Sequence, residues 1–579
     1  MTEGTLSRFR RRLASPEAAL PYALLGILSG AITAVLMIVF RLALEWPLAH
    51  WLPDQSPENF EALSWHWHLL LPFGGALLLG ICLHFVSPVH RFTGIPHVIA
   101  ALHNGRGRLP PANLFTQFAG GLVALLSGQS GGREGPAVHI GSAASSLFGA
   151  ALRLPNNSLR VMTACGTAAA IAASFNTPIA GVIFAMEVVM LEYTVAGFVP
   201  VILAAVTATT LSQAVFGAVV FLPATNVNMT SLLELPFIAL LGCIGGTLSA
   251  LFVLIQKRCL TWLNKPIWLR LGIAGLVTGV CALLAPQVLG IGYDSLQAAL
   301  DGSYSLQLLL LLTVLKLVAT AISCGMGMPI GIIGPSLLVG AFAGGALGIL
   351  GAAAVPALAP DHSFYVLMGM AALMGAILNA PLAALLAVIE LTHNLNIIFP
   401  AMLAVISAQL VHRELFKLQS AHQTTLLAMQ QAVRTNPLTL TLLRTSAAAV
   451  MDRNIKHVSQ KPDRHELQKL LEKPVRWLVI TNAEGQRIIV HREHWFPVLS
   501  ETQDTEADAG IDLLAVLENR RRAANFEING TLMEALETMN QEGLDSLFVS
   551  ARRQRRGPPD EGVITREALS DHYNLPIRF

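Results

Sequence analysis

The feature that most constrains this chain is a series of long apolar runs between residues 21 and 411. Most of them approach the roughly 20 residues that a helix needs to cross a bilayer. The clearest runs are residues 23–44, 68–86, 237–255, 271–284 and 308–322. Only 13% of the residues are charged, against about 25% in soluble domains. The sequence therefore predicts an all-α polytopic membrane protein.

Composition divides the chain into three parts. A basic N-terminus, residues 1–18, precedes a membrane domain, 19–425, and the tail, 426–579, has no run long enough to span. Four arginines stand before the first apolar run without a small-residue cleavage site after it: Arg8, Arg10, Arg11 and Arg12. We therefore expect a multi-pass protein of a bacterial-type inner membrane, with both termini in the cytoplasm. The formal net charge of +2 gives no indication of nucleic-acid binding.

The membrane domain is predicted to be duplicated, with repeats over about 19–215 and 230–425. GTAAAIAASFNTPIAGVIFAMEVV at 166–189 matches GMAALMGAILNAPLAALLAVIELT at 369–392. Three pairs share one offset: Asn176 and Asn379, Pro178 and Pro381, Glu187 and Glu390. The preceding segments also match, EGPAVHIGSAASSLFG with IGPSLLVGAFAGGALG. Breaks that agree in register indicate a duplication rather than a chance match of Ala-rich helices.

Apolar segments broken by Gly and Pro at corresponding places in two halves are typical of secondary transporters and related channels. A helix that begins inside the membrane directs unpaired N–H groups and its positive dipole end at the site, which favours an anion. Proline suits the first turn of such a helix, and glycine lets the backbone approach a ligand. Glu134 lies at one of these helix starts, and an ionisable residue there is a functional-site hypothesis by default. The alternative is a structural ion pair with Arg133.

These segments resemble the CLC family of chloride channels and proton/chloride antiporters. GREGP at 132–136 is highly specific for it, while TGIPHV at 93–98 and GIIGP at 331–335 are similar to two further family segments. The resemblance implies a CLC-type inverted repeat with broken helices, and a homodimer with one anion path per subunit. It also implies transport of chloride and similar monovalent anions, by a voltage- or pH-gated channel or by exchange for protons. It implies no enzymatic activity, cofactor or metal.

The resemblance also assigns roles to seven residues. Glu134 is the implied gating glutamate, which occupies the outer anion site when ionised and swings away when protonated. The implied anion-binding residues are Thr93, Gly94, Ile95, Ile332, Ile333 and His422. Thr93 replaces the family's usual serine and keeps its O–H donor. His422 matches a family tyrosine only across a one-residue gap, so the alternative is a histidine in the linker after the membrane domain.

Val188 stands where the family's antiporters usually carry a second glutamate that relays protons. Valine cannot carry a proton, and the family's channels also have an apolar residue there. Because some family antiporters lack the relay carboxylate, the channel and the antiporter both stay open. Glu187 and Glu390, which are duplicated, are expected to cap or buttress their helices.

The tail resembles a pair of CBS modules, over about 445–497 and 524–579. Each reads as strand, helix, strand, turn and strand, and apolar alternation in WLVITN and SLFVSA supports the strands. Such modules pair into a dimerising α/β domain. Nucleotide binding is in doubt, because Ala568 stands where nucleotide-binding modules often have an acidic ribose contact.

Two functions compete with chloride transport. GQSGG at 128–132 makes Ser130 a candidate nucleophile of an intramembrane serine hydrolase, although the pattern is short. A carrier for another anion, such as sulfate, would share the broken helices but not GREGP. His66 and His68 are a candidate metal pair, but histidines beside tryptophans more often mark the membrane interface.

Overall fold

The computed structural model describes residue 13 and residues 19–193, 195–217, 222, 227–355, 361–433, 436–462, 464–482, 486–502, 512–551 and 561–573. The chain divides into two compact units. The membrane unit contains Tyr22–Leu152 and Leu159–Arg434, and the tail unit contains Thr435–Phe579 with Met1–Pro21 and Arg153–Ser158. Apart from Leu13, the basic N-terminus expected over residues 1–12 and 14–18 lies outside the described residues.

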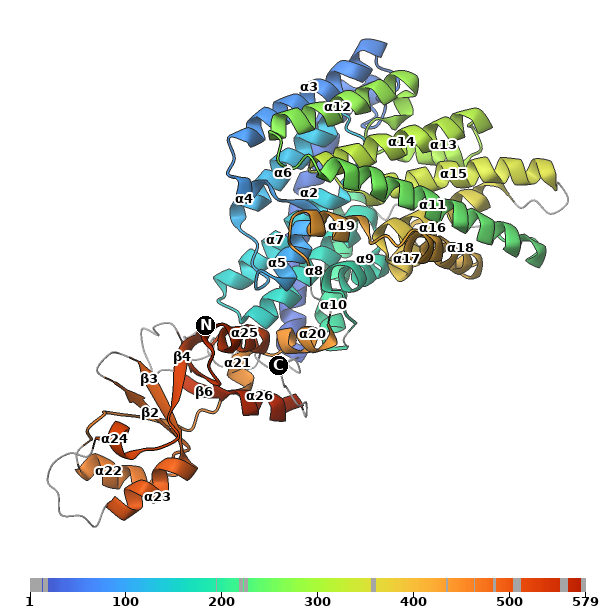
Figure 1. Cartoon of the computed structure of the whole chain (residues 1–579). Helices are drawn as coiled ribbons and strands as arrows, with labels where there is room; N and C mark the ends of the chain where they lie inside the picture. The colour runs from blue at the N-terminus through green and yellow to red at the C-terminus, as the bar shows by residue number, and fades with distance from the viewer. Residues whose placement is uncertain are drawn as a thin grey trace. The chain divides into compact units, whose positions relative to one another are not determined.

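The membrane unit is built from helices (Figure 1), which confirms the predicted all-α membrane class. Among the described residues, nine helices are long and apolar enough to cross a membrane. The helices of the first half are α2 (Ala19–Trp51), α3 (Trp65–His84), α4 (Pro88–Arg91), α5 (Gly94–His103), α6 (Pro111–Leu126), α7 (Glu134–Ala151), α8 (Asn156–Phe175), α9 (Pro178–Phe184), the π-helical turn η2 (Ala185–Met190) and α10 (Val195–Phe216).

The second half is also built from a mixture of long and short helices. Its members are α11 (Leu235–Leu260), α12 (Ile267–Leu284), α13 (Tyr293–Leu300), α14 (Leu306–Met326), α15 (Ile333–Ala354), α16 (His362–Leu378), α17 (Pro381–Thr392), α18 (Ile398–Leu410), the π-helical turn η6 (Val411–Leu415) and α19 (Ala421–Ala428). The helices α7, α8 and α9 correspond to α15, α16 and α17, as the sequence repeat predicted.

The Asn-x-Pro breaks have a local cause. Asn176 follows α8 and Asn379 follows α16, and both have left-handed backbone with φ of 60° and 54°. Asparagine tolerates this conformation, which ends a helix. The proline two residues later opens the next helix, where its missing N–H has no partner to lose. The motif therefore ends one helix and starts the next one within three residues.

The corresponding helices α9 and α17 run antiparallel. Glu187, just after α9, accepts backbone hydrogen bonds from Leu382 and Ala383 at the start of α17, at 3.3 and 2.7 Å. Glu390, near the end of α17, accepts the equivalent bonds at the start of α9, at 2.9 and 2.6 Å. Such reciprocal contacts are the mark of a two-fold relation. The two halves are therefore inverted repeats, and both glutamates cap helices as expected.

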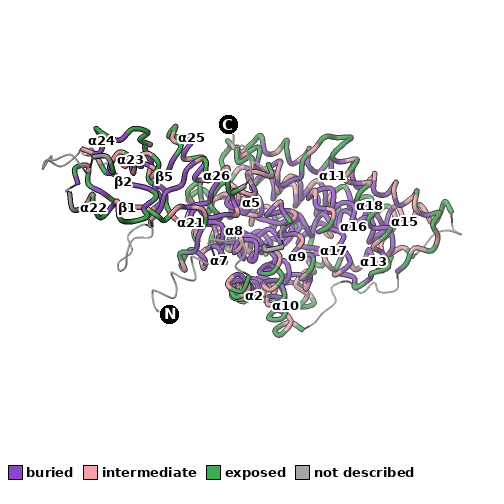
Figure 2. The backbone as a smooth tube through the Cα atoms, turned by 90° about the horizontal axis from the view of Figure 1, so that it is seen from below, coloured by how far each residue is buried: buried purple, intermediate pink, exposed green. Residues whose placement is uncertain are grey.

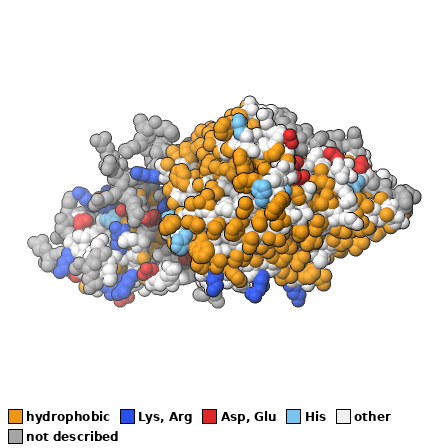
Figure 3. All heavy atoms as spheres, turned by 90° about the horizontal axis from the view of Figure 1, so that it is seen from above, with side chains coloured by type: hydrophobic (Ala, Val, Ile, Leu, Met, Phe, Trp, Pro, Cys, Tyr) orange, Lys and Arg blue, Asp and Glu red, His pale blue; other side chains and the backbone are white. Residues whose placement is uncertain are grey.

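Burial is concentrated in the helices next to the breaks (Figure 2). Every residue of α16 from Phe364 to Leu378 is buried, and α7 and α15 are buried over most of their length. Large apolar side chains are exposed on the outer helices instead, for example Leu24, Leu28, Val35 and Val39 on α2. Hydrophobic side chains cover most of the membrane unit's face in Figure 3. A helix bundle that exposes such a surface suits a lipid environment.

The tail unit contains a six-stranded sheet with the strands in sequence order. The strands are β1 (Ile455–Val458), β2 (Trp477–Thr481), β3 (Arg487–His491), β4 (Arg521–Glu527), β5 (Ser546–Ser550) and β6 (Glu561–Thr565). In each half the first two strands pair in parallel and the third is antiparallel. The parallel strands are joined through α22 (Arg464–Leu471) or α25 (Leu532–Glu542). This twice-repeated strand, helix, strand, strand order is the predicted mixed α/β tail.

Candidate functional site

Two broken helix starts meet inside the membrane unit. The backbone N–H of Gly132 donates to the carbonyl oxygen of Gly331 at 2.9 Å, and the N–H of Gly331 donates back to Gly132 at 2.7 Å. This short antiparallel bridge joins GREGP to GIIGP across the repeats. α7 begins two residues after Gly132 and α15 begins two residues after Gly331. The N-terminal ends of both helices therefore lie beside the bridge.

Glu134 is the first residue of α7 and is fully buried. Its carboxylate oxygen Oε1 accepts a hydrogen bond from the backbone N–H of Gly334, in the first turn of α15, at 2.8 Å. Its other oxygen, Oε2, has no hydrogen-bond partner among the described residues. The N–H groups of a first helical turn attract anions. The Glu134 carboxylate thus binds a donor of the kind that holds anions at helix N-termini.

Glycines make room for this carboxylate. A Cβ atom added to Gly334 would lie 2.6 Å from Oε1 of Glu134, and one added to Gly132 or Gly331 would collide with Oε2. A side chain at any of the three positions would displace the carboxylate. The glycines of GREGP and GIIGP are therefore needed for close approach. Gly334 is a contact that our sequence reasoning missed, although the repeat aligns it with Gly135 of GREGP.

The remaining predicted anion-binding residues lie at helix starts. Ile332 immediately precedes α15 and Ile333 is its first residue, so their N–H groups lack intrahelical acceptors. Thr93 precedes α5 and makes no capping bond with its hydroxyl. Gly94 begins α5 with a φ of 80°, in the left-handed region that favours glycine. Ile95 follows and is buried.

His422 is the second residue of α19, which contacts α5, α11 and α16. The side chain is buried, and its Nε2 atom has no hydrogen-bond partner among the described residues. A buried ring nitrogen without a partner is costly unless a ligand or water satisfies it. The structure therefore places His422 inside the membrane unit, on a helix packed against the one that Thr93 precedes, and not in an exposed linker.

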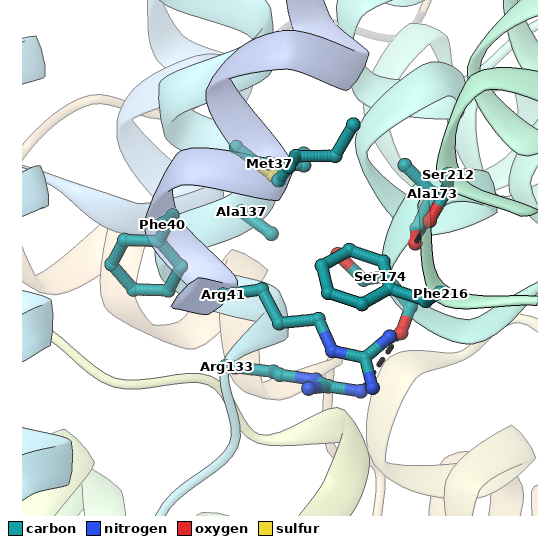
Figure 4. Close-up of a pocket in the computed structure, with 10 residues that line it drawn as sticks. Met37, Phe40, Arg41, Arg133, Ala137, Ala173, Ser174, Ser212 and Phe216 are labelled. Atoms are coloured by element: carbon teal, nitrogen blue, oxygen red, sulfur yellow. Dashed lines mark hydrogen bonds between the residues drawn. The ribbon is translucent and has the colours of Figure 1, made fainter. Parts of the chain in front are cut away.

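The guanidinium group of Arg133 binds Glu45 and the Ser174 carbonyl oxygen. Its Nη1 atom lies 3.1 Å from a carboxylate oxygen of Glu45 in α2, and its Nη2 atom donates to the Ser174 carbonyl oxygen at 2.9 Å, as Figure 4 shows. In the same figure Arg41 lies under the ring of Phe216, 4.0 Å from its centroid. Arg133 thus ties α2 to the end of α8. Glu45 carries no signal in the sequence that would have revealed this pairing.

Val188 lies in η2, is buried, and belongs to an apolar cluster. Its neighbour Glu187 is held by the N–H groups at the start of α17, so its carboxylate already has a structural role. Ser130 is buried with its hydroxyl 3.0 Å from that of Thr320, and no described histidine lies within hydrogen-bonding distance. No group of three potential metal ligands occurs among the described residues. His68 bonds the Phe60 carbonyl oxygen instead.

Inverted repeats whose helix N-termini meet around a buried carboxylate define a membrane transport protein for anions. Residues 75–413, more than half of the chain, match the family model described as voltage gated chloride channel. The chain therefore belongs to the voltage-gated chloride channel (CLC) family. It is a multi-pass membrane transport protein and not an enzyme, which sets aside the serine-hydrolase reading of Ser130.

Two curated relatives illustrate the range of this family. The chain is 32% identical over 390 residues to a putative chloride channel protein ClcB-like of Ralstonia nicotianae, covering 66% of this chain and 91% of the relative. It is 30% identical over 424 residues to the H(+)/Cl(-) exchange transporter ClcA of Vibrio vulnificus, covering 69% and 88%. The function common to both names is the transport of chloride.

Solved structures share the fold. A slow cyanobacterial Cl-/H+ antiporter has a TM-score of 0.62 at 24% identity, covering 71% of this chain and 97% of that one. A eukaryotic CLC transporter has a TM-score of 0.59 at 18% identity and covers 94% of this chain and 97% of its own. The second similarity covers more of the chain than the membrane unit contains, so it extends into the tail unit.

Proposed function

We propose that this protein exchanges chloride for protons across the membrane, with Glu134 as the gate and proton carrier. One observation carries the proposal: the buried Glu134 carboxylate is bound to the Gly334 N–H at the start of α15. An ionised carboxylate there competes with a transported anion for the same donors. Protonation removes its charge and weakens that bond, so the side chain releases the site and chloride enters.

The anion is bound by backbone N–H groups and neutral side chains. We assign the donors to Thr93, Gly94, Ile95, Ile332, Ile333 and His422. Their positions at three helix starts supply partial positive charge without a full cation, so an anion can bind and still leave. A monovalent anion such as chloride suits this donor set. A doubly charged anion such as sulfate would be better served by arginine or lysine, and the nearest, Arg133, is occupied by Glu45.

A chloride channel is the second candidate, and Val188 is the observation that favours it. A buried valine in an apolar cluster provides no proton acceptor next to α9. Relatives named as channels and as exchangers are both among the similar proteins. The two candidates differ in one measurable quantity, the number of protons moved for each chloride.

We also propose that the protein is a homodimer in the bacterial inner membrane, with both termini in the cytoplasm. The membrane domain spans about 19–425, and the CBS modules occupy about 445–497 and 524–579. The tail contributes to dimerisation rather than to nucleotide sensing. Beside Ala568, the carboxylate of Glu567 is already paired with Arg521 at 2.7 Å, so the expected ribose contact lacks a free acid at either position.

The test uses the purified full-length protein in liposomes loaded with chloride. A chloride gradient is imposed while a potassium ionophore clamps the voltage, and chloride and proton movements are recorded together. We expect uphill proton movement in the wild type. Glu134→Gln should abolish proton movement and retain chloride flux, because glutamine fills the same space but cannot ionise.

The matched control is Glu414→Gln, since this carboxylate in η6 is 70% exposed. We expect it to leave both fluxes unchanged. Chloride efflux without proton movement in the wild type would instead identify a channel. Proton coupling that survives in Glu134→Gln would refute the role of Glu134.

A further inference from the structure

A pair of buried histidines lies behind the helix starts. The Nδ1 atom of His97 in α5 is 2.9 Å from the Nε2 atom of His139 in α7, and the two rings are stacked with centroids 5.1 Å apart. His139 is completely buried. Its other nitrogen, Nδ1, is also buried and has no hydrogen-bond partner among the described residues.

The contact between the two rings requires a proton on one of the facing nitrogens. Two imidazole rings can share a nitrogen-to-nitrogen hydrogen bond only if one nitrogen carries a proton and the other presents a lone pair. A buried Nδ1 without a partner costs stability unless it is used, and such atoms often mark functional sites. The two rings are therefore joined by one hydrogen bond, and Nδ1 of His139 has no hydrogen-bond partner among the described residues.

The pair lies on the two helices that start at the site. His97 is about one helical turn after Gly94, the first residue of α5. His139 is five residues after Glu134, which is about 7.5 Å along the axis of α7. A proton would need bridging water molecules to cover that distance.

A polar stripe continues from His139 along α7. Ser142 and Ser146 follow His139 at helical spacing on the same face. The Ser142 hydroxyl lies 2.8 Å from that of Thr167, and Ser146 donates to the carbonyl oxygen of Gly107 at 2.7 Å. Gly107 lies between two exposed arginines of the loop after α5. The stripe is a row of buried polar groups between His139 and this loop, and no hydrogen bond among the described residues joins it to the pair.

We propose that His97 and His139 form the proton-transfer station that replaces the carboxylate missing at Val188. A proton binds Nε2 of His97, the Nδ1 proton of His97 moves to Nε2 of His139, and a proton leaves Nδ1 of His139 toward Glu134. One proton enters and one leaves, so no charge is left on the pair. This inference rests on the proposed exchange of chloride for protons.

The surroundings provide no competing acid close to the pair. The elements packed against α5 and α7 include α2, α6, α8, α15, α19 and η2; α6 and α15 contain no titratable side chain. Beside the pair itself, the titratable side chains of α5, α7, η2 and α19 are His103, Glu134, Glu187 and His422. α2 adds Tyr22, Arg41, Glu45 and His50, and α8 adds Arg160 and Cys165. Glu45 is paired with Arg41 and Arg133. Glu187 is held by α17 and His103 by the Val189 carbonyl oxygen. Arg160 of α8 donates to the Leu102 carbonyl oxygen at the far end of α5.

The experiment compares proton and chloride fluxes of full-length protein in the same liposome assay. His97→Asn and His139→Asn keep a polar side chain but cannot carry a proton through the ring. We expect each variant to lower the ratio of protons to chloride by at least about tenfold, the usual scale for losing a proton-transfer group. Loss of folded protein lowers both fluxes together, so the ratio isolates the proton path.

His412→Asn is the matched control, because both ring nitrogens of this buried histidine are already bonded, to Ser249 at 2.9 Å and to the Gln419 carbonyl oxygen at 3.2 Å. We expect its flux ratio to equal that of the wild type. An unchanged ratio in either His97→Asn or His139→Asn refutes proton transfer through the histidine pair, while leaving Glu134 as the proposed gate. A wild type that moves chloride without protons also overturns it, and leaves chloride transport itself intact.

Discussion

At the scale of the residue, Glu134 shows how one carboxylate can imitate the substrate. Its oxygen takes the hydrogen bond of the Gly334 N–H that a transported anion would otherwise receive. Three glycines provide the space, and no larger residue fits at any of them. The proposed gate therefore depends on residues that have no side chain, and a substitution of Gly132, Gly331 or Gly334 should disturb the carboxylate as much as a change of Glu134.

A second glutamate is predicted to control stability through pH. Glu58, in the loop between α2 and α3, accepts N–H bonds from Tyr293 and Asp294 at 2.6 and 3.1 Å. Burial, followed by the nearby charge of Asp294, raises the pKa of Glu58 to about 7. The folded protein then binds this proton more tightly than the unfolded chain, so stability falls as pH rises from 4.5 to about 7.

Glu58→Gln removes this titration and keeps an oxygen acceptor for the two N–H groups. We expect the thermal midpoint of the wild type to fall by about a degree or two more than that of the variant between about pH 5 and pH 7.5. Fluorescence-detected melting in detergent measures both. Parallel curves for the wild type and Glu58→Gln would contradict the assignment, and Glu414→Gln serves as the exposed control.

At the scale of the element, corresponding helix pairs pack through glycine. Gly141 of α7 faces Gly166 of α8, and Gly340 of α15 faces Gly369 of α16 in the other repeat. A Cβ atom added to Gly340 would lie 2.7 Å from the Gly369 carbonyl carbon. Small residues let membrane helices approach closely, where packing rather than water drives association. The duplicated glycines thus fix the separation of the two helices that lie between the Gly-Pro and Asn-x-Pro breaks of each repeat.

Gly340→Ala should therefore weaken the contact between α15 and α16. We expect a cost of roughly 1–3 kcal/mol and a lower thermal midpoint. Gly74→Ala in α3 is the control, because nothing lies within 4 Å of a Cβ atom there, and alanine is the better helix former by about 1 kcal/mol. Equal midpoints for the two variants would show that the glycine contact does not limit stability.

At the scale of the whole molecule, the inverted repeat explains why the site exists. Reciprocal bonds join Gly132 to Gly331, and reciprocal caps join Glu187 and Glu390 to the opposite repeat. Each repeat therefore supplies hydrogen-bond acceptors to backbone N–H groups of the other. The site lies where the equivalent helix starts meet, and only one of the two carries a carboxylate, since Ile333 replaces Glu134 in the second half. In the proposed mechanism, this departure from symmetry places the gating carboxylate in only one of the two repeats.

The full-length protein is expected to be a dimer that does not bind nucleotide. Native mass spectrometry from detergent should give twice the 61.9 kDa mass of the chain. Added ATP should leave that mass unchanged, because Ala568 cannot supply the acidic contact and Glu567 is paired with Arg521. A monomer mass would refute the dimer. An ATP adduct lost in Arg521→Ala would refute our reading of the tail.

The sequence predicted the membrane class, the duplication and the broken helices correctly, because each depends on local rules. Apolar length decides which segments can span, and Asn-x-Pro and Gly-Pro decide where helices stop and start. The capping role of Glu187 and Glu390 also followed from their duplication. The identity of their partners did not, because they lie in the opposite repeat, about 200 residues away along the chain.

What the sequence determined by itself is therefore the membrane class, the repeat with its helix breaks, and the family. What only the tertiary structure decided is which groups meet: Gly334 with Glu134, Arg133 with Glu45, and His97 with His139. The physical reason is that a hydrogen bond between distant segments depends on how helices pack in three dimensions. Neither residue type nor spacing reveals that packing, except where the duplication places the same residue at equivalent positions of both repeats, as it does for Glu187 and Glu390.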